Sequence, residues 1–152
     1  MNSTITGLAV PEFSAPMTSG KIFKLSDHRG KHVVLYFYPK DSTPGCTNES
    51  IQFNELLESF SQRKCMVFGI SRDSLKSHES FRLKHGFEFD LMSDSDEAVC
   101  QMFDVIKMKN MYGKQVRGIE RSTFLIDPNG VLKREWRKVS VSGHAQEVLD
   151  SI

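Results

Sequence analysis

The feature that most constrains the fold is an apolar run, VVLYFY (Val33 to Tyr38), that leads within a few residues into a helical pattern. A run of β-branched and aromatic residues is typical of a strand buried on both faces. Phe53, Leu56, Leu57 and Phe60 then recur at helical spacing and predict one apolar face of a helix. A buried strand followed directly by a helix is typical of an α/β domain.

Further strands and helices alternate along the rest of the chain. The turn signal DPNG (Asp127 to Gly130) predicts that the strands on either side of it pair antiparallel. Residues 1–30, with Pro11 and Pro16, predict a small N-terminal hairpin over one edge of the sheet. This order predicts a single domain, residues 1–152, with a central mixed sheet between layers of helices. The expected strands cover residues 65–71, 122–127 and 131–139, and the expected helices cover residues 74–85, 93–103 and 142–152.

The overall charge of the chain argues against two classes of partner. The formal net charge is +1, whereas nucleic acids and anionic membranes usually require a strongly basic face. We therefore expect no nucleic acid and no membrane as a partner, and we interpret the locally basic residues 107–121 as a solvated loop. The longest apolar run is far too short to span a bilayer. The N-terminus lacks the basic and apolar regions of a secretory signal, so we expect a cytoplasmic protein.

The chain has three cysteines, at positions 46, 65 and 100. An odd number at wide spacing, in a reducing compartment, predicts free thiols. Cys65 opens an apolar strand, and Cys100 shares a helix face with Phe103, so both are expected to be packing residues. The absence of a C-x-x-C motif argues against a dithiol oxidoreductase of the thioredoxin type and against the common zinc ribbons.

Cys46 differs from the other two because it lies at the predicted start of a helix, in the turn STPGCTNE. Thr43 suits the N-cap and Pro44 the first helical position, which makes Cys46 the third. Unpaired backbone N–H groups and the helix dipole favour a negative charge there, and so favour a thiolate. The polar turn offers no apolar run to bury the sulfur. Gly45 lets the backbone approach a bound molecule closely, at the end of a central strand where α/β sheets bind ligands.

A thiolate in such a turn suits two-electron attack on a small electrophile, and the transition state then needs a cation and hydrogen-bond donors. Thr43 supplies a hydroxyl, and Arg121 directly precedes the strand predicted at residues 122–127. If that strand lies beside the Val33 to Tyr38 strand, Arg121 can face Cys46. Arginine suits this role because it stays charged and offers several donors in a rigid fork. From the residues alone, Arg121 is one candidate among several, and the alternative is a surface charge.

These motifs resemble those of the peroxiredoxins. Pro39, Thr43 and Cys46 match the family signature P-x-x-x-T-x-x-C, in the required context after a buried strand and at the start of a helix. The stretch RSTFLID, which begins at Arg121, matches the family's second landmark. The local sequence TPGCT and the short C-terminus resemble those of the bacterioferritin comigratory protein subgroup, also called the Q type. The likeness extends from Pro11 to the last helix.

The resemblance implies a thioredoxin-like fold with an N-terminal β-hairpin extension, and a thiol-dependent peroxidase of antioxidant defence that needs no cofactor or metal. Cys46 would attack hydrogen peroxide or an organic hydroperoxide and become a sulfenic acid. Thr43 would hydrogen-bond the thiolate and the peroxide, and Arg121 would hold the thiolate and the developing charge. The residues implied to shape the pocket or to orient the arginine are Pro39, Pro44, Gly45 and Glu49.

The sequence departs from the subgroup at the resolving cysteine. Many members carry it five residues after the peroxidatic cysteine, where this chain has Ile51, and others carry it in the next helix, where residues 74–85 contain none. Either an outside thiol reduces the sulfenic acid, or Cys100 reaches it after local unfolding. We favour the outside thiol, from thioredoxin, a glutaredoxin system or glutathione. The subgroup resemblance also suggests a monomer.

Two other classes of function compete with this interpretation. A metal-binding protein would use its histidines, but His28 and His32 flank a turn, and His78 and His85 are expected to be surface residues of a helix. A non-catalytic interaction or chaperone module on the same fold is the second alternative, because a fold does not prove an activity.

Overall fold

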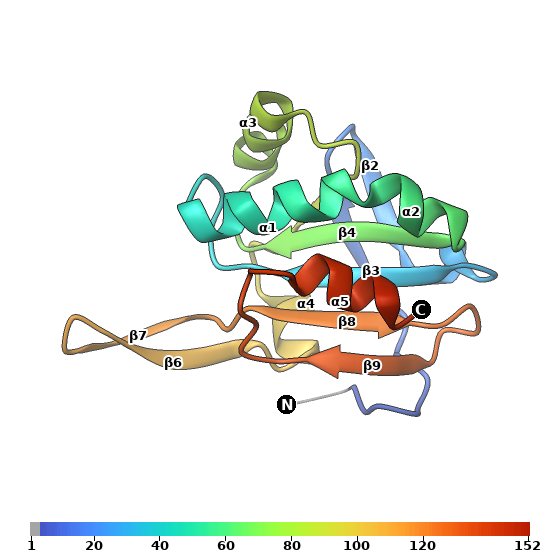
Figure 1. Ribbon diagram of the computed structural model, residues 1–152. Helices are drawn as coiled ribbons and strands as arrows, with labels where there is room; N and C mark the ends of the chain where they lie inside the picture. Colours follow the sequence, from blue (N-terminus) through green and yellow to red (C-terminus); the bar gives the residue numbers. More distant parts are fainter. Residues whose placement is uncertain (1–3) are drawn as a thin grey trace.

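The computed structural model describes residues 4–152, and its centre is a seven-stranded mixed β-sheet (Figure 1). The strand order is β2-β1-β5-β4-β3-β8-β9. β4 is parallel to both of its neighbours, β3 and β5, whereas the other neighbouring pairs are antiparallel. The strands of this sheet are β1 (Ser14–Met17), β2 (Lys21–Lys24), β3 (His32–Phe37), β4 (Cys65–Ser71), β5 (Leu91–Ser93), β8 (Ser122–Ile126) and β9 (Leu132–Trp136).

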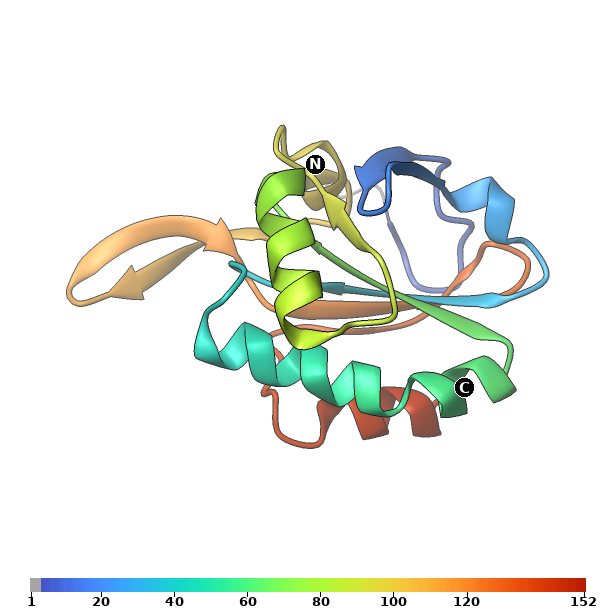
Figure 2. The ribbon, with the colours of Figure 1, turned by 90° about the horizontal axis from the view of Figure 1, so that it is seen from above.

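Helices cover the two faces of the sheet, and the β1–β2 hairpin at its edge curls over one of these faces. Figure 2 shows α1, α2 and α5 on one face, and α4 with the β1–β2 hairpin on the other. Among the described residues, no helix is long and apolar enough to cross a membrane. The helices are η1 (Leu25–His28), α1 (Pro44–Glu55), α2 (Leu57–Gln62), α3 (Leu75–His85), α4 (Ala98–Met102) and α5 (His144–Asp150), and a separate ribbon is formed by β6 (Ile106–Met111) and β7 (Lys114–Ile119).

The central strand β3 contributes side chains to two apolar cores. Val33, Leu35 and Phe37 belong to the cluster that includes residues of α4 and the N-terminal hairpin, whereas Val34 and Tyr36 belong to the cluster with residues of α1 and α5. Successive side chains of a strand point to opposite faces, and here both faces are covered. Each of these side chains is at most 1% exposed, and burying one contributes roughly 1.5–3 kcal/mol to stability.

The predicted α/β architecture with a mixed sheet is confirmed, and the structure supplies the strand pairing on which the position of Arg121 depends. β8 lies beside β3, with Phe37 opposite Ser122, so Arg121 lies at the end of β3 from which the chain continues into α1. β8 and β9 form the hairpin predicted from the Asp127–Gly130 turn. The N-terminal hairpin lies at the other edge, where β1 pairs with β5.

Two segments differ from the expectation. Residues 107–121, interpreted as a solvated loop, are largely occupied by the β6–β7 ribbon. The helical pattern through Phe60 is interrupted at Leu56, whose backbone N–H contacts the carbonyls of both Gln52 and Phe53. The pattern therefore spans two helices, because the change of hydrogen bonding at Leu56 ends α1 and begins α2.

Candidate active site

Cys46 lies at the third position of α1, as its sequence context predicts. Thr43 is the N-cap residue, with extended backbone angles (φ −90°, ψ 152°), and Pro44 is the first helical residue. The sulfur is therefore carried by the first turn of the helix, where backbone N–H groups have no partner within the helix. This environment and the helix dipole favour a negative charge on the sulfur.

The Cys46 side chain is buried, which corrects the expectation drawn from its polar turn. It is 1% exposed and belongs to the apolar cluster that contains Tyr36 and Phe53. The expectation was wrong because the covering groups come from the neighbouring strand and from the helix face, and not from the turn itself. In such a place, charge interactions are stronger than in water, so the charge of the sulfur depends on the few groups that contact it.

Arg121 is the fixed cation of the site. Its Nη2 donates to Cys46 Sγ at 3.4 Å, and its Nη1 donates to Glu49 Oε1 at 2.6 Å. The forked guanidinium can hold both partners at once, and the arginine side chain is only 16% exposed. Gly45 makes room for it, since a Cβ at that position would lie 3.2 Å from Nη2. The structure thus brings together four residues that the sequence singled out.

Glu49 is a buried carboxyl that shares the arginine with the sulfur. It is 1% exposed, and within residues 4–152 its Oε2 has no hydrogen-bond partner. Burial raises the pKa of Glu49 to about 7, although Arg121 acts in the opposite direction. Burial also opposes the charge on Arg121, but Glu49 and Cys46 outweigh it and raise the pKa of the guanidinium above its ordinary value. The arginine therefore stays a cation, and Glu49 changes its charge near neutral pH.

The loop between β3 and α1 contains the remaining residues predicted for the pocket. The Thr43 hydroxyl donates to the backbone carbonyl of Lys40 at 2.8 Å. Its single proton is therefore directed away from the sulfur, and its oxygen is left to accept a hydrogen bond. Pro39 is half-buried and Pro44 is exposed. The roles of these prolines in a peroxide pocket stay predictions.

Comparison with known proteins identifies the family. The AhpC/TSA family matches residues 6–135 of this chain. A curated relative, the peroxiredoxin Bcp of Xanthomonas campestris pv. campestris, is 52% identical over 100% of this chain and 96% of its own length. This chain belongs to the AhpC/TSA family and is a peroxiredoxin of the Bcp type.

Further relatives and solved structures agree with this assignment. The peroxiredoxin Bcp of Bacillus subtilis is 45% identical over 96% of this chain and 93% of its own length. A solved structure of the bacterioferritin comigratory protein of Xanthomonas campestris matches with a TM-score of 0.90 and 51% identity, over 97% of this chain and 96% of that one. The structure of BcpB from Mycobacterium tuberculosis matches with a TM-score of 0.86 and 31% identity, over 97% and 96%. The predicted thioredoxin-like fold and the thiol-dependent peroxidase class are confirmed.

The other two cysteines of the peroxiredoxin are packing residues, as the sequence predicts. Cys65 is 3% exposed, and burial raises the pKa of its thiol to about 12. Cys100 is fully buried, and burial, followed by the nearby Asp94 carboxylate, raises the pKa of its thiol still further. Both sulfurs stay protonated at neutral pH, so neither is a strong nucleophile. Cys100 also belongs to the core on the opposite face of the sheet from Cys46.

His78 is a feature of the site's surroundings that the sequence analysis misjudged. It was expected on the surface of α3, but it is 0% exposed. Its Nδ1 lies 2.8 Å from Asp41 Oδ2, and its Nε2 lies 2.8 Å from the Met92 carbonyl. Since both partners accept, both ring nitrogens donate when the ring is protonated. His78 thereby ties α3 to the loop that leads to Cys46.

The Asp41 carboxylate holds this loop by several hydrogen bonds. Its Oδ1 accepts from the Tyr38 hydroxyl at 2.6 Å, and its Oδ2 accepts from the Ser77 hydroxyl at 2.7 Å as well as from His78. Burial alone raises the pKa of Asp41, but the bonds from His78, Tyr38 and Ser77 outweigh it and hold that pKa below its ordinary value. The adjacent Ser42 adopts a positive φ of 61°, a conformation that this network helps to maintain.

Asp41, Asp73 and His78 are also close enough to one another to hold a metal ion, with ligand atoms within 4.8 Å. These atoms already have protein partners, however. Asp73 Oδ2 accepts from the Asp41 backbone N–H at 2.9 Å and from the Ser71 hydroxyl at 2.6 Å. We therefore interpret the group as a hydrogen-bond network that positions the loop.

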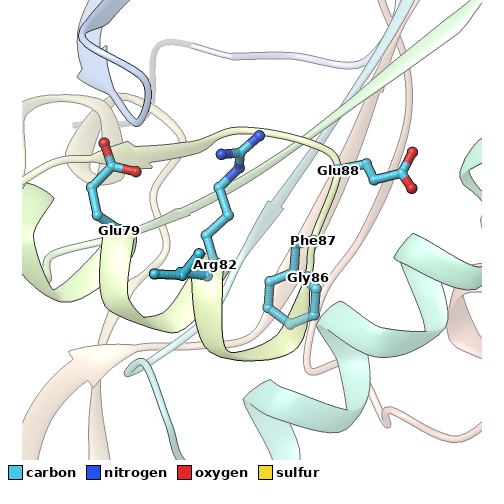
Figure 3. Close-up of a pocket in the computed structure, with 6 residues that line it drawn as sticks. Glu79, Arg82, Gly86, Phe87 and Glu88 are labelled. Carbon is cyan, nitrogen blue, oxygen red and sulfur yellow. The ribbon is translucent and has the colours of Figure 1, made fainter.

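The C-terminal half of α3 borders a surface hollow of about 530 Å³ (Figure 3). Glu79 and Arg82 extend to the same side of the helix in this view. Glu79 accepts from the Ser19 backbone N–H at 2.9 Å, and Arg82 donates to the Phe89 carbonyl at 3.0 Å. These bonds anchor α3 to its neighbours. The described residues that line the hollow include no cysteine, although this is the helix in which some members of the subgroup carry the resolving thiol.

Proposed function

We propose that Cys46 reduces peroxides by direct attack of its thiolate on one peroxide oxygen. The sulfur donates an electron pair, the O–O bond breaks, and the sulfur becomes a sulfenic acid. The departing oxygen takes up a proton and leaves as water or as an alcohol. The observation that carries this proposal is the 3.4 Å contact between Cys46 Sγ and the Arg121 guanidinium, in the first turn of α1.

Arg121 is assigned to the charge that develops during the attack. Negative charge passes from the sulfur to the departing oxygen, and a planar guanidinium with several donors can stabilise it at both positions. Glu49 orients the arginine through the 2.6 Å ion pair. A peroxide bound beside the sulfur, with its oxygens in reach of the guanidinium donors, would be aligned for in-line attack, which lowers the entropic part of the barrier.

The residues of the loop and of the helix start are assigned to peroxide binding. The Thr43 oxygen accepts a hydrogen bond from the peroxide O–H, since its own proton is donated to Lys40. Gly45, Pro39 and Pro44 shape the space around the sulfur. The 1% exposure of Cys46 favours small hydroperoxides, or ones with a narrow end, over bulky molecules.

The sulfenic acid is returned to the thiol by an outside reductant. One thiol condenses with it to a mixed disulfide and releases water, and a second thiol releases Cys46 by exchange. Cys100 is a poor internal partner because it packs on the other face of the sheet. We propose thioredoxin, or a glutaredoxin and glutathione system, as the reductant.

We further propose hydrogen peroxide and organic hydroperoxides as substrates, in antioxidant defence. The Xanthomonas campestris bacterioferritin comigratory protein, 51% identical to this chain, has alkyl peroxide reduction activity, which supports an organic substrate. Residues 1–152 would act as one catalytic domain, as a monomer in the cytoplasm.

The experiment that tests the proposal compares Cys46→Ser with Cys100→Ser in a peroxide consumption assay, with dithiothreitol as the reductant. We expect no turnover above background for Cys46→Ser and near wild-type turnover for Cys100→Ser. Ordinary turnover by Cys46→Ser would refute the assignment of the nucleophile. A Cys46–Cys100 disulfide, found by mass spectrometry after one equivalent of peroxide, would refute the outside-thiol cycle alone.

A further inference from the structure

The β6–β7 ribbon projects from the body of the molecule as an arm, as both Figure 1 and Figure 2 show. It consists of residues 106–119, which include Lys107, Lys109, Lys114 and Arg117 and no acidic residue. The whole chain is nearly neutral, with a net charge of +1, so this arm is a local concentration of positive charge. The role proposed for Cys46 does not account for it.

The register of the ribbon separates its side chains into two faces. Residues directly opposite each other in an antiparallel pair share a face, and alternate positions along each strand share it too. Lys109 lies opposite Val116, and Met111 lies opposite Lys114. Together with Lys107 they form one face, which we call the basic face. It combines positive charge with apolar surface, since Met111 is 48% exposed and Val116 is 41% exposed.

The base of the arm is fixed to the body. Arg117 forms an ion pair with Glu97, at the start of α4, and Arg72 bonds the same carboxylate at 2.9 Å. Arg117 belongs to the face opposite the basic face, because it pairs with Met108. One face of the arm is thus used to hold it in position. On the basic face, Lys107 is half-buried and forms an ion pair with Asp104 at 3.1 Å, whereas Met111, Lys114 and Val116 farther out are exposed to solvent. A surface held in this way is preorganised for binding.

The arm leaves the body next to the reactive sulfur. Figure 1 and Figure 2 both show its root at the same end of the molecule as the N-terminus of α1. β7 ends at Ile119, two residues before Arg121 along the chain, and the Lys109 ammonium donates to the Ile119 carbonyl. Burial first, and the charge of Arg121 second, lower the pKa of Lys109. The basic face therefore continues to the edge of the site.

We propose that the basic face of the arm is the docking surface for an acidic thiol protein of the thioredoxin kind, which reduces the oxidised Cys46. The inference rests on the outside-thiol cycle proposed above. A small thiol needs no extended surface, whereas strands of six residues each extend roughly 20 Å, a length that suits contact with a protein. Positive charge at the rim attracts an acidic partner, and the apolar side chains of Met111 and Val116 supply short-range contact.

The test compares a charge-reversed arm with a matched control. Lys107→Glu/Lys114→Glu reverses the charge of the arm. Lys24→Glu/Lys31→Glu makes the same change in net charge at two exposed positions far from the site, the last residue of β2 and the residue before β3. A purified bacterial thioredoxin of net negative charge is the probe. The kcat/KM of each peroxidase variant for this thioredoxin is measured at low and at high salt. Each variant is also assayed with uncharged dithiothreitol.

We expect kcat/KM for thioredoxin to fall about tenfold or more in the arm variant at low salt, because charge at a binding rim mainly alters the association rate. The loss should shrink at high salt. The conservative variant Lys107→Arg/Lys114→Arg, which keeps both positive charges, should retain the wild-type kcat/KM. Turnover with dithiothreitol should not change in any variant. The control double variant should stay within about twofold of wild type.

Three outcomes would overturn the proposal. They are an unchanged kcat/KM for thioredoxin in the arm variant, an equal loss of kcat/KM in the control variant, and a wild-type protein that turns over with dithiothreitol but not with thioredoxin. If the wild-type protein binds anionic vesicles or nucleic acid, the arm variant loses that binding, and its kinetics with thioredoxin are unchanged, the basic face is assigned to that partner instead. Failure of the wild-type protein with both dithiothreitol and thioredoxin would refute the peroxidase cycle on which the inference rests, whereas failure with thioredoxin alone would refute only the docking surface.

Discussion

Replacement of Arg121 by methionine tests how much of the peroxide reaction depends on a single guanidinium. The change keeps most of the side-chain volume but removes the cation and the donors. In the structure, the guanidinium nitrogen lies 3.4 Å from Cys46 Sγ. At an effective dielectric constant of about 20, two unit charges at this separation attract each other by about 5 kcal/mol.

The full attraction is not available to the sulfur. Glu49 lies 2.6 Å from the same guanidinium, and the arginine side chain keeps 16% of its exposure, so water and the carboxyl both reduce the attraction. We expect about 2–3 kcal/mol to remain, which corresponds to a loss of about 30- to 160-fold in the second-order rate constant for peroxide. Arg121→Lys should lie between wild type and Arg121→Met, because it keeps the charge but loses the fork.

The assay is stopped-flow mixing of the reduced protein with hydrogen peroxide at pH 7, with the sulfenic acid quantified by mass spectrometry. Arg134→Met, on the neighbouring strand β9, is the matched control and should change the rate constant by less than twofold. A rate constant for Arg121→Met within about threefold of wild type, in a folded protein, would refute the electrostatic role.

Three other predictions concern groups around the sulfur. Cys100→Ser should leave turnover with an outside thiol within about twofold of wild type in a steady-state peroxide assay, and a greater loss would implicate Cys100 in the cycle. Glu49→Gln should change the pH dependence of stability. Because burial raises the pKa of Glu49 to about 7 in the folded protein, its contribution is present below about pH 4.5 and is lost as the pH rises through 7. Over that interval wild type should lose about 3 kcal/mol relative to the variant in urea unfolding, and parallel curves would contradict this. His78→Phe should cost about 1.5–3 kcal/mol in the free energy of unfolding, because it removes a hydrogen bond to the buried Asp41 carboxylate. His85→Phe, at a partly exposed position of the same helix, should cost less than about 1 kcal/mol, and equal costs would show that the hydrogen bond to Asp41 is not the cause.

The position of Cys46 could be predicted from the sequence because helix starts depend on nearby residues. Thr43 and Pro44 mark the first turn without any knowledge of the rest of the fold. The burial of the sulfur could not be predicted in the same way, because its cover comes from β3 and from the apolar face of α1. The contact with Arg121 required the pairing of β8 with β3, for which the family resemblance was the main guide.

His78 and the arm were missed for different physical reasons. His78 bonds to Asp41, 37 positions away in sequence, and helical periodicity among charged neighbours carries no sign of that contact. The arm did have a local signal, since charged and apolar residues alternate along IKMKNM. Its turn is formed by Tyr112 and Gly113, both with positive φ, as a tight hairpin of the I′ type requires. Tyrosine rarely occupies such a position, so the turn was not recognised.

The placement of Cys46 and Cys100 on opposite faces of the sheet has a consequence for the cell. A disulfide requires Cα atoms within about 7 Å of each other, and the sheet between the two thiols keeps them from meeting in the folded protein. The sulfenic acid of Cys46 therefore persists until an outside reductant reaches it, and a second peroxide molecule can react with it first. Oxidation beyond the sulfenic stage is not reversed by ordinary thiols. The fraction of protein carrying a sulfinic acid would therefore record how far peroxide had outpaced the supply of reducing equivalents.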